Sequence, residues 1–281
     1  MTKKLFLISL FLLVSAFILN IALYFIYPNI SRLKKENPKK TAFMEYTEKR
    51  WKEKGIKRKI ARRWVRYSRI SPCLVKAVLI AEDDKFWSHE GFDIEGIEKA
   101  IEKNIKAKKF KAGGSTISQQ LAKNLYLSPS KSPVRKLKEA ILTWRIEKAL
   151  SKRRILELYL NVAEWGEGIF GIEAAARHYY GKSASELGPE ESARLAAVLP
   201  NPKRYNPMGS SRYVANRSRL IYRIMVRRGI VIQHIEEEVA EMEQEGTESA
   251  ETPSEGPVEA ASAPLSPEEA NPSINEVPPA E

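Results

Sequence analysis

An uninterrupted run of 23 uncharged residues near the N-terminus, Leu5–Tyr27, constrains this chain more than any other feature. A helix of this length crosses a bilayer core of about 30 Å. A cleaved signal peptide has a shorter apolar centre of about 7–15 residues and ends in small residues, whereas this run ends in bulky aromatic residues that suit a membrane interface. The pattern predicts an uncleaved single-pass anchor, and residues 1–30 are assigned to it and its N-terminal tip.

Charge divides the rest of the chain into a basic body and an acidic tail. Residues 231–281 contain 14 Glu and no Asp, Lys or Arg, so the residues before them hold 47 Lys and Arg against 21 acidic side chains, a net charge of +26. A body this basic suits an anionic partner: nucleic acid, an anionic membrane surface or a phosphorylated substrate. A solvated basic surface with no specific partner is the simpler alternative.

The domain boundaries follow from composition and helical periodicity. Residues 31–63 form a basic connector that is expected to be partly helical, and residues 64–230 have the length of one domain. Residues 231–281 are rich in Pro, Ser, Ala and Glu and are predicted to be disordered. Alternating strand patterns are scarce, so the fold is predicted to be mainly α, with helices over 72–82, 133–144, 152–161, 172–180, 189–199 and 217–225.

The segment 113–124, Gly-Gly-Ser-Thr-Ile-Ser-Gln-Gln-Leu-Ala-Lys-Asn, holds the densest set of candidate binding groups. Its paired glycines allow a tight turn, and Ser115 or Thr116 can cap the helix that follows. The polar side chains then form a shelf that suits a ligand with sugar amides and phosphate, consisting of Gln119, Gln120, Lys123 and Asn124. An ordinary helix with a polar outer face is the alternative.

A second cluster, residues 82–91, combines four carboxylates, one histidine and two aromatic side chains. Glu82 ends an apolar helix, where partial desolvation would raise its pKa and make it a better proton acceptor near neutral pH. An acidic helix end without a role is the alternative. His89 is interpreted as a structural residue of its loop, because the other two histidines are distant in sequence and a metal site needs several converging groups.

Cations surround another carboxylate in the segment 135–139. Arg135 and Glu139 are spaced i,i+4, which is the geometry of a simple surface ion pair. The functional interpretation is a carboxylate among cations that organises a phosphate or its counter-ion, with Lys136 beside it.

Matches to two motifs, and one function class, are rejected. The sequence G-x-G-x-x-G at 166–171 follows a charged helical segment rather than the buried strand that a dinucleotide site requires. The S-x-x-K matches at 31–34 and 128–131 have no K-T-G partner in the chain. No nucleic-acid-binding motif accompanies the basic charge.

Five segments, taken in order, resemble the signatures of the peptidoglycan glycosyltransferases, glycosyltransferase family 51. They are E-D-x-x-F-x-x-H-x-G at 82–91, G-G-S-T-I-x-Q-Q-L-x-K-N at 113–124, R-K-x-x-E at 135–139, K-x-x-I-L-E-x-Y-L-N at 152–161, and E-A-A-x-x-Y-x-G-K with one extra spacer residue at 173–182. Five ordered motifs argue strongly against chance agreement. No penicillin-binding domain follows them, so the chain resembles the monofunctional biosynthetic transglycosylases.

The resemblance implies a fold and a reaction. The fold would be a lysozyme-like bilobal helical domain, with its smaller lobe facing the membrane. The N-terminal transmembrane helix would precede this domain in the chain. The enzyme would polymerise lipid II, an undecaprenyl-diphosphate-linked disaccharide-pentapeptide, into β-1,4-linked glycan strands and release undecaprenyl diphosphate, in cell wall biogenesis and the maintenance of cell shape. The implied partners are lipid II, the growing lipid-linked glycan and the membrane, with other cell-wall synthesis proteins as candidates and no nucleic acid.

The resemblance also assigns roles to residues. Glu82 would be the base that takes the proton from the acceptor's 4-hydroxyl, and the diphosphate would leave from the opposite face with inversion. Glu139 would be the second catalytic carboxylate, helped by bound water or by a divalent cation such as Mg²⁺ or Mn²⁺, although the sequence specifies no cofactor. The substrate-binding residues would be Ser115, Gln119, Gln120, Lys123, Asn124, Lys131, Arg135 and Lys136, with Arg217 as a further candidate for phosphate. Lys131 stands where family members often have Arg, and Lys binds phosphate as a point charge rather than as a fork.

The location expected from the resemblance is the bacterial inner membrane, with a cytoplasmic N-terminus and a periplasmic catalytic domain. The charges beside the anchor do not decide this orientation, because Lys3 and Lys4 precede it while Arg32, Lys34 and Lys35 follow it.

Two other functions remain open at this point. A lysozyme-like lytic transglycosylase would cut glycan with one Glu as general acid and would not need the cation cluster of Lys123, Arg135 and Lys136. A non-enzymatic membrane scaffold would instead use the acidic tail as its docking element.

Overall fold

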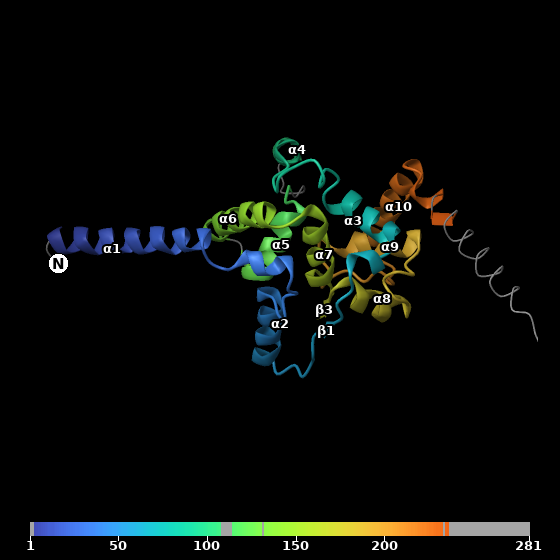
Figure 1. Ribbon diagram of the computed structural model, residues 1–281, viewed down its shortest axis with the longest axis horizontal. Helices are drawn as coiled ribbons and strands as arrows, with labels where there is room; N and C mark the ends of the chain where they lie inside the picture. The colour runs from blue at the N-terminus through green and yellow to red at the C-terminus, as the bar shows by residue number, and fades with distance from the viewer. Residues whose placement is uncertain (1–2, 108–113, 131, 233, 236–281) are drawn as a thin grey trace, which may run out of the picture. The chain divides into compact units, whose positions relative to one another are not determined.

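The computed structural model describes residues 3–107, 114–130, 132–232 and 234–235. The predicted disordered tail, 231–281, lies outside the described residues from 236 onward. Residues 231–232 and 234–235 are helical and Val231 is buried, so the folded part extends beyond the predicted boundary at 230. The described part is mainly helical, as predicted (Figure 1). Its α-helices are α1 (Lys3–Ala22), α2 (Ala42–Glu53), α3 (Pro72–Glu82), α4 (Ile94–Ala107), α5 (Ile117–Tyr126), α6 (Pro133–Ala149), α7 (Lys152–Val162), α8 (Ile172–Tyr180), α9 (Pro189–Val198) and α10 (Arg212–Arg227).

Short elements complete the described part. Three 3-10 turns, η1 (Leu23–Phe25), η2 (Ile30–Lys34) and η3 (Tyr67–Arg69), lie between the early helices. The strands β1 (Ala61–Arg62), β2 (Glu164–Gly166) and β3 (Ile169–Phe170) form one small sheet in the order β1-β3-β2, in which β1 is parallel and β2 antiparallel to β3. The G-x-G-x-x-G segment at 166–171, which was rejected as a dinucleotide site, therefore lies in the β2–β3 hairpin and at the start of α8.

Proline and hydroxyl side chains set where the helices begin. Proline occupies the first turn of α3, α6 and α9, where its missing N–H is not needed. Ser132 and Ser151 cap α6 and α7, because each hydroxyl accepts a hydrogen bond from the backbone N–H three residues on. Thr116 and Gln119 form a reciprocal capping box at the start of α5. The helices that carry the site thus have fixed N-termini.

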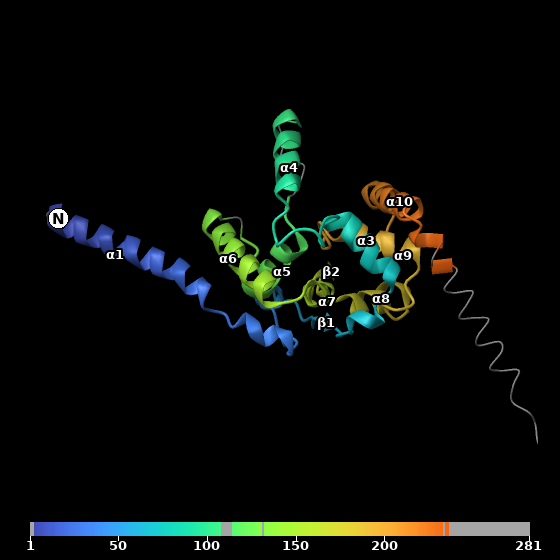
Figure 2. The same ribbon diagram turned by 45° about the horizontal axis from the view of Figure 1, so that its top comes forward.

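The helices pack in two groups around one continuous apolar core. Helix α9 packs against both α3 and α10, and α5 packs against both α6 and α7. The largest fully buried side chains include Trp165 of β2, Tyr159 of α7 and Phe86 of the turn after α3. Cys73 is buried in α3. Helix α4 stands away from the other helices in both views (Figure 2) and exposes three isoleucines, Ile94, Ile101 and Ile105.

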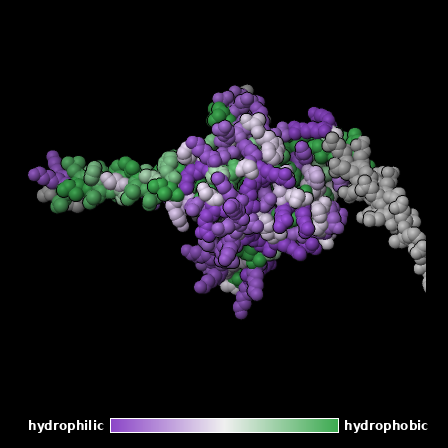
Figure 3. All heavy atoms as spheres, in the orientation of Figure 1, coloured by the Kyte–Doolittle hydropathy of each residue, from purple (hydrophilic) through white to green (hydrophobic). Residues whose placement is uncertain are grey.

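The predicted anchor forms a helix that is long and apolar enough to cross a membrane. The helical span has a mean hydropathy of 2.6 and buries none of its most apolar window against the rest of the protein. Figure 3 shows its apolar spheres as a continuous surface, next to a body that is mainly hydrophilic. The guanidinium of Arg145 in α6 binds the end of the span, because it donates to the backbone carbonyls of Tyr24, Ile26 and Pro28 at 2.7–2.8 Å.

The predicted connector, residues 31–63, is folded against the body rather than extended between two parts. Ile30 and Leu33 of η2 belong to the main core. Helix α2 buries Met44, Thr47 and Trp51. The Trp51 ring lies over Gly168, where a Cβ would come within 2.2 Å of the ring. This segment is part of the domain because Leu33, Met44 and Trp51 are buried there.

Candidate active site

Glu82 lies at the C-terminal end of α3 with its side chain 10% exposed. Burial raises the pKa of its carboxyl, and four weaker effects lower it: the hydrogen bonds from Gln120 and Arg217, and the charges of Arg217 and Lys123. Gln120 Nε2 donates to Glu82 Oε2 at 2.8 Å, and Arg217 lies 3.4 Å from Oε1. In this environment the carboxylate of Glu82 binds a proton more readily than an exposed glutamate does.

The neighbouring Asp83 joins the end of α3 to the start of α5. Its two oxygens accept hydrogen bonds from His89 Nε2 and from the backbone N–H of Ile117, both at 2.9 Å. His89 Nδ1 in turn accepts from the N–H of Gly91 at 3.0 Å, so Nε2 carries the ring proton. His89 is therefore a structural residue of its loop, as predicted. This connection fixes Glu82 relative to the side chains of α5.

Tyr159 of α7 supports the same arrangement through a hydrogen bond to α5. Its buried hydroxyl donates to Gln120 Oε1 at 3.1 Å. The amide of Gln120 thus accepts from Tyr159 and donates to Glu82. Nothing in the local sequence around residue 159 predicts this contact, because the two residues are 39 positions apart and the tyrosine sits among apolar side chains.

Glu139 is the centre of a cluster with two cations. Its side chain is 3% exposed, and its oxygens accept from Arg135 Nη1 and Lys136 Nζ. Lys136 Nζ also reaches the hydroxyl of Ser115 at 3.2 Å. Lys123 lies close enough for its charge to interact with Glu139, Arg135, Lys136 and Glu82, and burial lowers its pKa. The structure therefore brings Glu82, the predicted base, and the predicted cations into one electrostatic environment.

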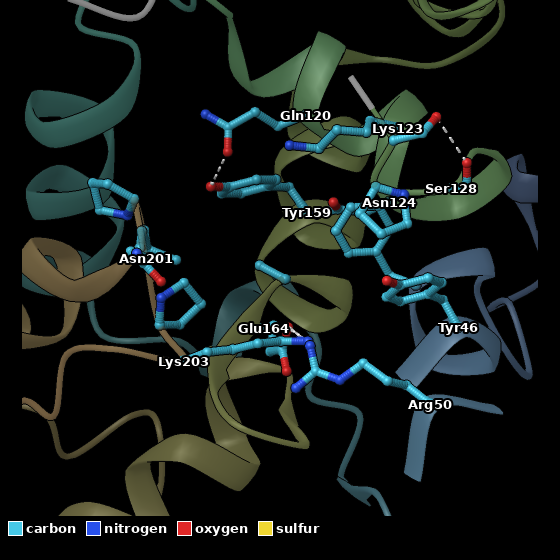
Figure 4. Close-up of a pocket in the computed structure, with 17 residues that line it drawn as sticks. Tyr46, Arg50, Gln120, Lys123, Asn124, Ser128, Tyr159, Glu164, Asn201 and Lys203 are labelled. Carbon is cyan, nitrogen blue, oxygen red and sulfur yellow. Dashed lines mark hydrogen bonds and ion pairs between the residues drawn. The ribbon is translucent and has the colours of Figure 1, made fainter. Parts of the chain in front are cut away.

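Gln120 lines one cavity and Glu82 lines another. The larger, of 470 Å³, is lined by Gln120, Lys123 and Asn124 of α5 and by Tyr159. Figure 4 shows Tyr46 and Arg50 of α2 on one side of it and Lys203 on another. A smaller cavity, of 210 Å³, is lined by Glu82 and Ser115. The hydrogen bond between Gln120 and Glu82 connects the walls of the two cavities.

Some predicted binding residues are placed differently from the others. The side chain of Gln119 is buried and its oxygen accepts from Thr116 N at 3.0 Å, so it serves the helix start instead of the shelf. Arg217 binds Glu82 and the carbonyl of Ala81 and does not stand with the other cations. Lys131 lies outside the described residues. Asn124 is mostly buried and lines the larger cavity.

Three side chains of α2 form a wall of the larger cavity that the sequence did not indicate: Phe43, Tyr46 and Arg50. The ring of Phe43 lies 5.6 Å from Lys123 Nζ, within range of a cation–π contact. Across the cavity, Lys203 lies 3.4 Å from Glu164, whose pKa burial raises. The cavity therefore offers an aromatic surface and two charged groups, Lys203 and Glu164, that are not part of the cluster around Glu82.

The described residues contain no group of three or more His, Cys, Asp or Glu side chains that could hold a metal ion. The carboxylate of Glu139 is instead occupied by two cationic side chains. A divalent cation near Glu139 stays a prediction.

Comparisons with known proteins agree with the geometry. The transglycosylase family matches residues 49–226. A biosynthetic peptidoglycan transglycosylase of Nitrosospira multiformis is 52% identical over 185 residues, which are 66% of this chain and 80% of the relative. Proteins of the same name from Aromatoleum aromaticum and Chromobacterium violaceum are 55% identical over 190 residues and 45% identical over 219 residues, and the matches cover 66% and 78% of this chain and 83% and 92% of those relatives.

The family matches well over half of the chain, and its range includes α3 with Glu82, α5 with Gln120 and Lys123, and α6 with Glu139. The fold is accordingly the predicted mainly α, lysozyme-like one. The chain belongs to the transglycosylase family and is a peptidoglycan glycosyltransferase of cell wall synthesis.

Proposed function

We propose that this chain polymerises lipid II into β-1,4-linked glycan strands and that Glu82 is the general base. One observation carries the proposal: Glu82 is a buried carboxylate with a raised pKa, and it interacts with a cluster of cations. These cations, Lys123, Arg135 and Lys136, outnumber the one carboxylate among them, Glu139. A base needs a pKa closer to the working pH than an exposed glutamate has. A departing diphosphate needs fixed positive charge.

The reaction can be written with the residues in these roles. The acceptor's 4-hydroxyl gives its proton to the free lone pairs of Glu82 while its oxygen bonds to the anomeric carbon of the donor. The bond from that carbon to the diphosphate breaks on the opposite face, and undecaprenyl diphosphate leaves with the electron pair. Inversion of the anomeric carbon gives the β-1,4 bond. The proton ends on Glu82 and passes to water between cycles.

Lys123, Arg135 and Lys136 would stabilise the negative charge that develops on the leaving group. Glu139 supports them by holding Arg135 and Lys136 in place. The role of Glu139 is then one of positioning, because its oxygens face cations and not the acceptor. Ser115, Gln120 and Asn124 remain candidates for contacts with the sugar and phosphate groups, and Lys131 stays a prediction.

The location follows from the substrate. A lipid-linked donor is presented at a membrane surface, and the apolar helix α1 keeps the domain there. We place the chain in the bacterial inner membrane, with a cytoplasmic N-terminus and a periplasmic catalytic domain. Interaction with other cell-wall synthesis proteins stays a prediction.

The test is incubation of the purified full chain with labelled lipid II, followed by separation of the products by length. Growth of glycan chains is expected. Shortening of added glycan, without any growth from lipid II, would indicate the lytic alternative, and no change in either substrate would indicate a scaffold.

A further inference from the structure

A separate cavity of 770 Å³ is lined by four arginines: Arg63, Arg66, Arg69 and Arg177. It shares no lining residue with the two cavities at Glu82 and Lys123. Its walls come from the segment around η3 and from α8. In Figures 1 and 2, α7 lies between α8 and the helices α5 and α6 that carry the catalytic cations. The arginine cavity is therefore a different surface of the same domain.

Glu173 orients two of these arginines from beneath. It is 5% exposed, and its carboxylate accepts from Arg177 Nε at 2.6 Å and from the N–H of Ala184 at 2.8 Å. Arg63 Nε lies 4.0 Å from the same carboxylate. These contacts use the Nε side of each guanidinium. Among the described residues, the terminal amino groups of Arg63 and Arg177 have no ion-pair or hydrogen-bond partner, so they stay available to a ligand.

The other two arginines have no acidic partner in the described part of the chain. Arg66 and Arg69 are exposed at the rim. Glu186 lies beside the cavity wall, where it accepts from both the N–H and the hydroxyl of Ser183. Those hydrogen bonds lower the pKa of Glu186, so it counts as negative. Four guanidiniums against the two carboxylates of Glu173 and Glu186 leave a net charge of +2.

We propose that this cavity binds a multivalent oxyanion, with two or more phosphate or carboxylate groups held by Arg63, Arg66, Arg69 and Arg177. The planar guanidinium fork matches such groups with two hydrogen bonds each. One exposed ion pair contributes little because water and salt screen it, so a ligand with a single charge would not be retained. A ligand that engages several arginines at once adds these small contributions, and the cavity has the volume for it. Trp64, which also lines the wall, offers apolar surface for the ligand's carbon skeleton.

Binding is measured with the full chain in discs of neutral lipid, by titrating tripolyphosphate and, separately, citrate at low salt in a calorimeter. We expect one anion per chain and an affinity that falls as salt rises. The double variant Arg66→Ala/Arg69→Ala should lose at least tenfold in affinity. Its matched control is Arg223→Ala/Arg227→Ala, which removes the same charge from exposed positions of α10 and should lose less than threefold. Equal losses in the two variants would overturn the proposal, because they would show a general effect of net charge.

Two further arms refine the result. Arg66→Lys/Arg69→Lys keeps the charge and removes the forks, so an affinity between those of the wild type and the alanine variant is expected; wild-type affinity would contradict the fork geometry. A last titration distinguishes a lipid headgroup from a soluble anion as the natural ligand, and either result is compatible with an oxyanion site. Repeating the titration in discs of anionic phospholipid should weaken tripolyphosphate binding if a lipid headgroup occupies the cavity, and should leave it unchanged if the ligand is soluble. Thermal unfolding of each variant checks that the fold is intact.

Discussion

Gln120 holds Glu82 through a hydrogen bond of 2.8 Å from its side-chain nitrogen to Oε2 of the carboxylate. The oxygen of the same amide accepts from the hydroxyl of Tyr159. Burial raises the pKa of this hydroxyl well above its ordinary value, so it remains a donor at any working pH. Tyr159 therefore decides which end of the amide faces the carboxylate. Glu82 keeps its other oxygen, 3.4 Å from Arg217, for exchange with a substrate proton.

Glu82→Gln should abolish polymerisation and leave the protein folded. The amide has the size of the carboxylate but cannot accept a proton, and general base catalysis contributes about 10²–10⁴-fold. Turnover of labelled lipid II is the measurement, with circular dichroism and thermal unfolding as controls for the fold. Polymerisation at the wild-type rate would remove Glu82 from the role of base.

The pH profile should report the raised pKa of Glu82. The base works only when ionised, so kcat/KM should rise with pH and should level off above the pKa of this carboxyl, which burial places above that of an exposed glutamate. Gln120→Leu removes the hydrogen bond that lowers this pKa, so its rising limb should lie at higher pH. A limb that stays in place, or that moves to lower pH, would contradict the contact as the tuning group.

Stability should show the same titration with a defined sign. The folded-state pKa of Glu82 lies above the unfolded value, so the folded protein binds the proton more tightly. Wild-type stability at this site is then fully present below the unfolded pKa and falls as pH rises to the folded pKa. Glu82→Gln has no proton to lose, and its free energy of unfolding should rise relative to the wild type across that window. Urea unfolding at a series of pH values measures the difference.

Lys123→Met should mainly weaken substrate binding. The substitution keeps the length of the side chain and removes its charge, and a hydrogen bond to a charged group is worth about 1.5–3 kcal/mol, or roughly 10–100-fold in affinity. Binding of lipid II is best compared in the Glu82→Gln background, where no turnover occurs. Lys76→Met, on the exposed side of α3, is the matched control. Unchanged affinity in the Lys123 variant would count against phosphate contact.

Helix positions were largely predictable, while the short strands, helix α4 and the packing of α2 were not. Pro72, Pro133 and Pro189 mark helix starts that the structure confirms, because proline is well suited to the first turn. Strands of two or three residues are too short to display an alternating pattern. Helix α2 buries only three of its twelve residues, and its place depends on Trp51 covering Gly168, a contact across the fold.

The sequence predicted which charged residues form the candidate site, but it did not predict the hydrogen bonds that connect them. The two neighbouring glutamines illustrate this: Gln120 bonds Glu82, whereas Gln119 caps its own helix. The spacing from Thr116 to Gln119 is that of a capping box, so this signal was present in the sequence. The partners of Asp83 and the hydroxyl of Tyr159 had no such signal, since they arise from the packing of separate helices.

Glu139→Gln should destabilise the domain and reduce activity together. The change leaves Arg135 and Lys136 without the carboxylate that both bind. Breaking a fully buried pair costs about 3–5 kcal/mol, and we expect about 1–3 kcal/mol here because the Lys136 side chain is 48% exposed. Glu36→Gln, which breaks an exposed i,i+4 pair with Arg32, should change the free energy of unfolding by less than about 0.5 kcal/mol. Equal effects in the two variants would contradict the central position of Glu139.

Tyr159→Phe tests whether the amide of Gln120 must be oriented for catalysis. The variant keeps the buried ring and removes the hydroxyl, so the amide loses its donor and can turn its oxygen towards Glu82. An oxygen there repels the carboxylate, so the pKa of Glu82 should rise and the rising limb of the kcat/KM profile should move to higher pH.

Loss of one hydrogen bond should lower the free energy of unfolding of the Tyr159 variant by about 0.5–1.5 kcal/mol. Tyr179→Phe is the control, because that hydroxyl binds the backbone carbonyl of Trp165 and has no contact with Gln120. If both variants lose similar stability and only Tyr159→Phe shifts the pH profile, orientation of the amide is a catalytic requirement. An unshifted profile would reduce Tyr159 to a packing residue, since its ring alone would then account for its place beneath α5.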